Sequence, residues 1–159
     1  VILALIAIGL LVLQVKQLAG ATTDELEHTR SQLGKLEFII PRNRGELRHF
    51  YRLSLTAGID EEVLWRGFMI WYRNQFMPLW GAAVLSTIGF AGAHAYQGAA
   101  NVPRITLVGA VFAGLYLLTG SIWVSIVLHA AVDVLQGRTA YEVLSRLEPE
   151  ADDGHTVST

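Results

Sequence analysis

The sequence predicts an all-α protein, a polytopic bundle of transmembrane helices of which about five spans are present. Apolar residues make up 52% of the 159 residues and charged residues only 16%, against about 25% in a typical soluble domain. Residues 74–103 contain no Asp, Glu, Lys or Arg, and residues 105–137 contain only Asp133. Stretches of this kind are candidates to cross a bilayer, which takes roughly 20 mostly apolar residues.

The chain begins in an apolar run, residues 1–15, without the basic start or small-residue cleavage site of a signal peptide. We expect this run to be the end of a transmembrane helix whose first part is missing, so that the sequence is N-terminally truncated. Residues 16–50 form a polar connector. Thr22 or Thr23 is suited to cap a helix in it. Leucines at roughly helical spacing indicate an amphipathic helix on the membrane surface or on the bundle, or else an ordinary solvated connector.

The expected catalytic core, residues 51–137, holds four further helices. The sequence predicts them at residues 51–72, 79–95, 105–118 and 122–136. Pro78 suits the start of the second of these helices. The tight turn around Gly120 makes the last two an antiparallel hairpin. Residues 138–159 are expected to be a polar tail, disordered from about Glu148.

Two further patterns concern the packing of these helices. Small residues four apart, such as Gly109 and Ala113, predict close contact between helices. Ser86 and Ser125 lie in apolar stretches, and we expect them to hydrogen-bond to carbonyls of their own helices.

Lys and Arg residues predict the orientation, because they concentrate on the cytoplasmic side of membrane proteins. With five crossings, the connector, the loop at residues 97–104 and the tail share one side. That side holds Lys16, Arg30, Lys35, Arg42, Arg44, Arg48, Arg52, Arg104, Arg138 and Arg146, and the other side only Arg73. We therefore expect an integral protein of the plasma or inner membrane, surrounded by membrane lipid, with its polar site facing the cytoplasm.

Composition also excludes several kinds of protein. The net charge of −2 gives no basic surplus and there is no nucleic-acid-binding signature, so nucleic acid is not an expected partner. The chain has no cysteine, so it has neither a disulfide nor a cysteine nucleophile. The H-E-x-x-H zinc motif and the G-x-S-x-G motif are absent. A bound metal would need histidine and carboxylate ligands.

Ionisable residues inside the apolar stretches are the candidates for chemistry, since charge at membrane depth is costly and usually functional. Glu62 and Arg66 lie one helical turn apart and can neutralise each other as an ion pair. Glu61 points about 100° away from Glu62 and has no local partner, which suits a general base. Taken alone, the group fits equally well a structural ion pair with one carboxylate at an interface.

Two histidines lie in later stretches. His94 follows Phe90 by one turn, and alone it fits a hydrogen-bonded core residue better than a ligand. His129 and Asp133, also one turn apart, suit an oriented catalytic histidine, a metal site or a simple hydrogen bond. Together, Glu61, His94 and His129 come from three predicted spans and could meet in one pocket. They could hold a zinc-bound water. Without metal, Glu61 could activate a water held by His94, while His129 and Asp133 stabilise the tetrahedral oxyanion.

These motifs resemble the CPBP family of intramembrane proteases, which includes the type II CAAX prenyl endopeptidases and the bacterial Abi proteins. The family pattern is E-E-x-x-x-R, then F-x-x-x-H, then H-x-x-x-N or H-x-x-x-D. The chain has E-E-V-L-W-R from Glu61, F-A-G-A-H from Phe90 and H-A-A-V-D from His129. The resemblance covers roughly residues 57–136.

The resemblance implies a membrane-embedded all-α fold with a cytoplasm-facing cavity. It implies roles for six residues: Glu61 activates water, Glu62 and Arg66 support it, His94 lies near the water, and His129 and Asp133 occupy the oxyanion or metal position. Many eukaryotic and archaeal members that cleave prenylated CaaX tails carry Asn where this chain has Asp133, a common bacterial variant. An ionised Asp is a poor oxyanion donor. The family has been classed as metalloproteases and is also argued to use a metal-free glutamate. A divalent metal such as zinc on Glu61, His94 and His129 therefore stays open.

The sequence thus predicts an intramembrane endopeptidase that cleaves a membrane-bound or lipidated substrate, including prenylated CaaX-type peptides, through a Glu-activated water. The alternative is a non-catalytic membrane scaffold or bacteriocin-immunity protein that keeps the protease fold. The intact Glu61, His94 and His129 argue against it, because a scaffold need not keep costly buried charges. A transporter or ion channel is disfavoured because the spans show no internal repeat or broken-helix pair.

Overall fold

A computed structural model describes residues 9, 12–13, 15–16 and 20–148. Every regular element in this part of the chain is a helix, which confirms the all-α prediction. Most of the predicted transmembrane run at residues 1–15, and all of residues 149–159 in the predicted tail, lie outside the described residues.

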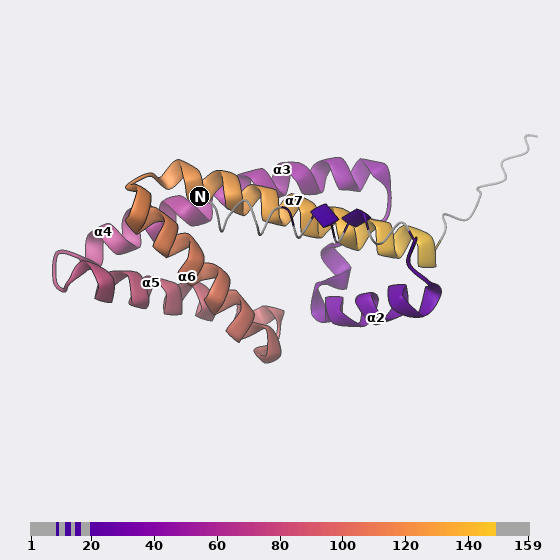
Figure 1. Cartoon of the computed structure of the whole chain (residues 1–159), viewed down its shortest axis with the longest axis horizontal. Helices are drawn as coiled ribbons and strands as arrows, with labels where there is room; N and C mark the ends of the chain where they lie inside the picture. Colours follow the sequence, from indigo (N-terminus) through magenta and orange to yellow (C-terminus); the bar gives the residue numbers. More distant parts are fainter. Residues whose placement is uncertain (1–8, 10–11, 14, 17–19, 149–159) are drawn as a thin grey trace, which may run out of the picture.

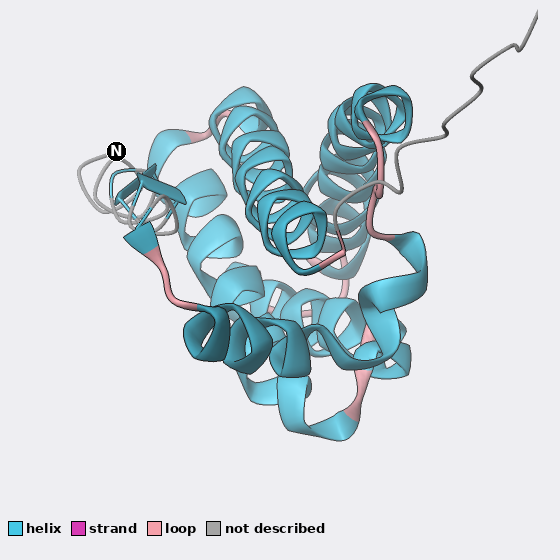
Figure 2. Cartoon of the chain, turned by 90° about the vertical axis from the view of Figure 1, so that its right-hand side faces the viewer, coloured by secondary structure: helices cyan, strands magenta, loops and turns pink. Residues whose placement is uncertain are grey.

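The helices form two layers. α3, Arg44–Glu62, and α7, Ile122–Leu147, run side by side along the molecule and share its largest helix–helix contact (Figure 1). α5, Leu79–Ala93, and α6, Val102–Thr119, pack together against one end of this pair, and α2, Thr23–Leu33, packs against the other end. Figure 2 shows the same arrangement along the long axis of the molecule.

The connector begins with α2, which Thr22 caps. The backbone N–H of Glu25 donates to Oγ1 of Thr22 at 3.4 Å, and the Glu25 carboxylate accepts from the backbone N–H of Thr22 at 2.8 Å. This reciprocal pair is a capping box, which satisfies two N–H groups that a helix start leaves free. A short 3₁₀ helix, η2 (Gly34–Ile39), follows α2.

The apolar face of α2 packs on the bundle, which was one of the three predicted alternatives. Leu26 is buried against Val143 of α7, and Leu33 packs against a second buried cluster that includes Ala140 and Leu144. These contacts explain why α7 continues to Leu147 rather than ending near residue 136. The apolar residues of its last turns cover the connector, so residues 138–147, predicted to be part of a polar tail, are helical.

A continuous helical rod contains the first motif. It runs from α3 through η3, Val63–Met69, into α4, Ile70–Arg73. It begins seven residues before the predicted start at residue 51, because Asn43 caps it by accepting from the N–H of Glu46 at 2.9 Å. η3 has π-helix geometry, which is rare and found mostly as short segments at functional sites.

The remaining helices follow the predicted order. Pro78 lies at the N-cap of α5, and two 3₁₀ turns, η4 (Ala95–Gln97) and η5 (Ala99–Asn101), form the predicted loop before α6. Gly120 ends α6 with a φ of +63°, a left-handed conformation that glycine adopts without strain. α7 begins two residues later, so the predicted hairpin is confirmed.

Small residues allow the helices near the first motif to pack closely. Ala82, Ala83 and Ala113 form one buried cluster with Ile70, which agrees with the close packing predicted for Ala113. Gly109 lies against the Phe90 ring, and a Cβ at this position would be 3.0 Å from Cδ1 of that ring.

Among the described residues, one helical stretch, Ala99–Thr119, is long and apolar enough to cross a membrane, with a mean hydropathy of 1.6. α5 is apolar but shorter. The predicted polytopic bundle therefore has one span supported by length and hydropathy. The rod formed by α3, η3 and α4 carries the charged residues of the first motif, and charge lowers the hydropathy of a helix wherever its side chains point.

Candidate active site

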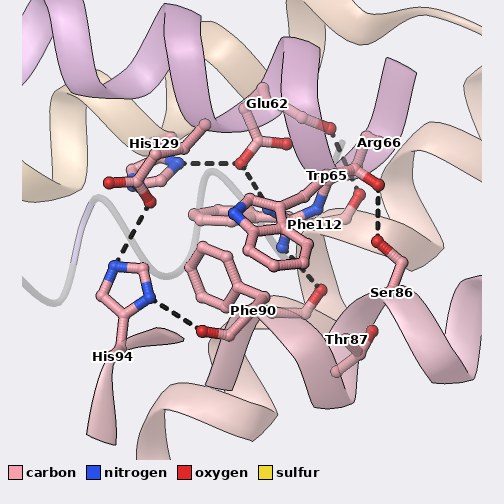
Figure 3. A network of polar contacts seen from close by, with 12 residues as sticks. Glu62, Trp65, Arg66, Ser86, Thr87, Phe90, His94, Phe112 and His129 are labelled. Carbon is pink, nitrogen blue, oxygen red and sulfur yellow. Dashed lines mark hydrogen bonds and ion pairs between the residues drawn. The ribbon is translucent and has the colours of Figure 1, made fainter. Parts of the chain in front are cut away.

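The innermost part of the site is an ion pair within the rod. Glu62 is 0% exposed and Arg66 is 1% exposed. Nη1 of Arg66 donates to Oε1 of Glu62 at 2.9 Å, as their i, i+4 spacing predicts (Figure 3). Nη2 of Arg66 donates to the carbonyl oxygen of Gly109 on α6 at 3.0 Å. Such additional hydrogen bonds are what make burial of a charge pair tolerable.

Two aromatic rings enclose the Arg66 guanidinium. Its Cζ lies 4.5 Å from the centre of the Phe90 ring and 5.4 Å from the centre of the Phe112 ring. A guanidinium over an aromatic face is attracted by the negative charge of that face. Phe90, the first residue of the second motif, thus contacts Arg66, the last residue of the first motif.

His129 on α7 is fixed by the same carboxylate oxygen. Its Nδ1 lies 2.8 Å from Oε1 of Glu62, and its ring stacks on Phe112 with the centres 4.9 Å apart. Because Glu62 is ion-paired with Arg66 and can only accept, Nδ1 carries the proton and donates it. Nε2 of His129 therefore faces the other way, toward Glu61.

His94 is oriented in a similar manner from the end of α5. It occupies the C-cap of that helix, and its Nδ1 lies 2.8 Å from the carbonyl oxygen of Phe90. A carbonyl oxygen can only accept, so Nδ1 donates and Nε2 is left to face the site. The spacing of four residues in the second motif thus fixes which nitrogen of His94 is available.

The two histidines meet at Glu61. Oε2 of Glu61 lies 3.3 Å from Nε2 of His94 and 3.9 Å from Nε2 of His129. This oxygen is buried and has no hydrogen-bond partner of good geometry among the described residues, although the Glu61 side chain as a whole is 29% exposed. These distances confirm that the side chains of Glu61, His94 and His129, from three predicted spans, come together as the sequence indicated.

Asp133 lies at the edge of this group. Its Oδ2 is 3.7 Å from Nε2 of His129, and its side chain is 33% exposed. The separation is too long for a hydrogen bond, so the simple helix-stabilising bond considered for this pair is not formed. His129 is held by Glu62 instead, and Asp133 is free to act on Nε2 or on a bound group.

The arrangement suits the binding and activation of water. With both Nδ1 atoms donating outward, neutral His94 and His129 each present a nitrogen lone pair toward a carboxylate oxygen. Lone pairs so placed repel one another unless a hydrogen or a cation lies between them. A water molecule supplies two hydrogens to such a group, one to a histidine nitrogen and one to the Glu61 carboxylate, which can then act as the general base.

The same atoms are of the kinds that bind metal ions. Zinc prefers imidazole nitrogen and carboxylate oxygen in tetrahedral sites, and Glu61, His94 and His129 supply donors of that kind. However, no group of three or more His, Cys, Asp or Glu in the described part of the chain is arranged to hold a metal ion. The three side chains have the right donor atoms for a metal ion, but their positions do not form a metal site.

Buried serines tie the site to its neighbours. Oγ of Ser86 donates to the carbonyl oxygen of Trp65 in η3, and Oγ of Ser125 donates to that of Phe112 at 3.2 Å. Both bonds cross between helices, so the expectation that these serines bond within their own helices is wrong. Trp65 lies in the π segment η3, so the bond from Ser86 joins that segment to α5.

Three contributors to the site were not predicted. Phe112 and the Gly109 carbonyl come from α6, which carries no motif, and Ser86 was assigned only a local bond. The sequence indicates that Phe90 matters, because it is the first residue of the second motif. Its contact with Arg66 depends on how the helices pack and could not be predicted.

Comparison with known proteins agrees with this site. A family model described as type II CAAX prenyl endopeptidase Rce1-like matches residues 43–135, which is 93 of the 159 residues and includes all six predicted site residues. No curated protein and no solved structure matches the chain. The match confirms the resemblance seen in the three motifs.

Proposed function

Because the chain belongs to the Rce1-like family of type II CAAX prenyl endopeptidases, we propose that it is an intramembrane endopeptidase. It hydrolyses a peptide bond of a membrane-bound or lipidated substrate through a water activated by Glu61. The observation that carries the proposal is the position of Oε2 of Glu61, 3.3 Å from Nε2 of His94 and 3.9 Å from Nε2 of His129.

In the proposed reaction, Nε2 of His94 holds the water while Glu61 takes one of its protons. The water oxygen bonds to the carbonyl carbon, and the electron pair of the C=O bond moves to its oxygen. When this tetrahedral intermediate collapses, the C–N bond breaks and the proton on Glu61 goes to the leaving nitrogen. General acid–base catalysis of this type contributes about 10²- to 10⁴-fold in rate.

His129 and Asp133 are proposed to face the developing oxyanion. Since Nδ1 of His129 donates to Glu62, Nε2 donates to an oxyanion only when the ring carries two protons. An ionised Asp133 cannot donate, so it serves the oxyanion only as a neutral acid and otherwise orients Nε2 of His129. Donors aimed at a developing negative charge are usually the largest contribution to such catalysis.

The surface supports a location inside a membrane. Large apolar side chains are exposed along α5, α6 and the first half of α7, among them Trp80, Leu107, Leu118, Trp123 and Val127. A soluble monomer rarely exposes apolar area of this extent, and lipid would cover it. The distribution of Lys and Arg further supports a site that opens to the cytoplasm.

The proposal is tested with the full chain purified in detergent and a library of membrane-anchored peptides. Wild type is compared with Glu61→Ala and with Asp60→Ala, each with and without a chelator. Asp60 is the matched control: it is an exposed carboxylate one residue away, on the same helix. Loss of cleavage in Glu61→Ala, with cleavage kept in Asp60→Ala and in chelator, supports a metal-free glutamate mechanism.

Two other outcomes of this experiment would change the proposed mechanism or the proposed function. Cleavage lost in chelator and restored by zinc would assign a metal to Glu61, His94 and His129. Absence of cleavage by folded wild type across a broad library would favour the scaffold or immunity protein instead.

A further inference from the structure

The start of α3 carries three arginines on one exposed face, here called the arginine stripe: Arg44, Arg48 and Arg52. They are four residues apart, so each lies about 6 Å further along the helix than the one before. Residues at this spacing share a face. The stripe therefore extends over about 12 Å of the helix surface.

The arginine stripe has no counter-charge within the described part of the chain. No ion pair or hydrogen bond joins the guanidinium groups of its arginines to another described residue. Glu46, which lies nearby, is already engaged with the backbone N–H of Arg42 and the side chain of Asn43.

Four other arginines in the described part of the chain are paired with acids, unlike those of the stripe. The pairs are Arg30 with Glu37 and Glu148, Arg42 with the same two acids, Arg66 with Glu62, and Arg138 with Glu142. The hydrogen bond that Arg30 donates to Glu37 lowers the pKa of the Glu37 carboxyl. Among residues 20–148, no acid is paired with the arginine stripe in this way.

Large apolar side chains are exposed on α3 directly after the arginine stripe, beside the exposed polar residues Thr56 and Asp60. Leu55 and Ile59 are exposed there, one and two turns beyond Arg52. α6 repeats the change, since exposed Arg104 is followed by exposed Leu107. A change from exposed arginine to exposed leucine within one turn is what a helix shows where it passes from lipid headgroups into hydrocarbon.

We propose that the arginine stripe binds the phosphate groups of anionic phospholipids and thereby sets how deeply α3 enters the membrane. This inference rests on the intramembrane location in the proposed function. Arg52 lies at the edge of the hydrocarbon, Arg48 among the headgroups and Arg44 at their outer edge. Guanidinium groups bind phosphate oxygens in pairs, and an anionic leaflet attracts each cation near its surface.

Anchoring at the arginine stripe also defines the depth of the active site. Glu61 lies nine residues beyond Arg52, which is about 13 Å further along the helix. A helix held at Arg52 therefore places the water-activating carboxylate well below the headgroups. The substrate must then present its scissile bond at that depth, as a membrane-inserted or lipid-anchored segment would.

The test measures lipid binding by the full chain in detergent micelles. Phosphatidylglycerol or phosphatidylcholine is titrated in, and the unfolding temperature is followed through the fluorescence of the four tryptophans. We expect phosphatidylglycerol to stabilise the wild type at lower concentration. Arg52→Gln and Arg48→Gln should each weaken this apparent affinity about fivefold, and Arg44→Gln less. The matched lysine variants keep the charge and should keep most of the preference.

Three outcomes would overturn the inference. One is an undiminished phosphatidylglycerol preference in the triple glutamine variant. Another is stabilisation by inorganic phosphate at equal concentration, which would make the ligand a free anion. The third is a lower unfolding temperature of the triple glutamine variant without lipid, which would show a partner inside the chain. Because the readout is binding, it can fail or succeed independently of peptide cleavage.

Discussion

Nδ1 of His129 lies 2.8 Å from Oε1 of Glu62, on the oxygen that also accepts from Arg66 at 2.9 Å. One buried carboxylate oxygen thus joins α7 to the rod that contains the first motif. It fixes the His129 ring so that its other nitrogen faces Glu61. The two adjacent glutamates therefore differ in kind: Glu62 holds the site together, and Glu61 is the group that a substrate water can reach.

We expect Glu62→Ala to destabilise the protein far more than Glu61→Ala. Removing Glu62 leaves the Arg66 charge buried and unpaired, which costs about 3–5 kcal/mol in the free energy of unfolding. Glu61 is partly exposed, so its removal should abolish cleavage with little change in stability. Unfolding temperature and peptide cleavage, measured on both variants, check this. Equal unfolding temperatures for the two would contradict the division of roles.

Phe90→Leu should weaken the enclosure of Arg66. The ring lies 4.5 Å from the guanidinium, and a desolvated contact of this kind is worth about 2 kcal/mol. We expect a lower unfolding temperature and reduced cleavage. Phe76→Leu is the matched control, since Phe76 is exposed in the turn before α5. The interpretation is wrong if both variants behave as wild type.

Asp133→Asn should retain cleavage within a few-fold, whereas Asp133→Leu should lose at least tenfold. Both asparagine and a neutral aspartic acid can donate a hydrogen bond to an oxyanion, and leucine cannot. Initial rates on one identified substrate separate the two substitutions. Loss of cleavage in Asp133→Asn would show that the negative charge of Asp133 is needed, and its role would then be to orient His129.

Ser86→Ala should lower both stability and activity. Without the Ser86 hydroxyl, the Trp65 carbonyl of the π segment loses the donor from α5, and an unmatched acceptor that is kept from water costs about 1–3 kcal/mol. Trp65 directly precedes Arg66, so the ion pair shifts with it. Thr87→Ala is the control, because Thr87 bonds only to a carbonyl of its own helix, that of Ala83. Comparable cleavage by the two alanine variants would remove Ser86 from the site.

Gly137→Ala should disrupt the contact between α3 and α7. An added Cβ would lie 2.0 Å from Cε1 of Phe50, so the ring or the helix must move, and overpacking typically costs about 1–3 kcal/mol. Gly92→Ala is expected to be neutral or slightly stabilising, since a Cβ there meets nothing within 4 Å. The unfolding temperatures of the two variants, compared with wild type, test this prediction. An unchanged unfolding temperature for Gly137→Ala would mean that this contact is loosely packed.

The sequence by itself determined the features that depend on neighbours along one helix. The apolar periodicity predicted helices throughout, Gly120 marked the hairpin turn, and Thr22 marked the start of α2. The spacing of Glu62 and Arg66 predicted their ion pair, because i and i+4 are adjacent on any α-helix. The three motifs indicated the family without any knowledge of the structure.

Only the tertiary structure decided how the helices relate to one another. The sequence could not show that Glu62 rather than Asp133 holds His129, or that Ser86 of α5 donates a hydrogen bond to Trp65 in the π segment. The predicted end of α7 was too early, since Val143 and Leu144 are buried against Leu26 of α2 and against Ile40, which the sequence pattern could not show. The spacing of residues along one helix determines which of them share a face of that helix. Which other helix packs against that face depends on how all the helices pack together.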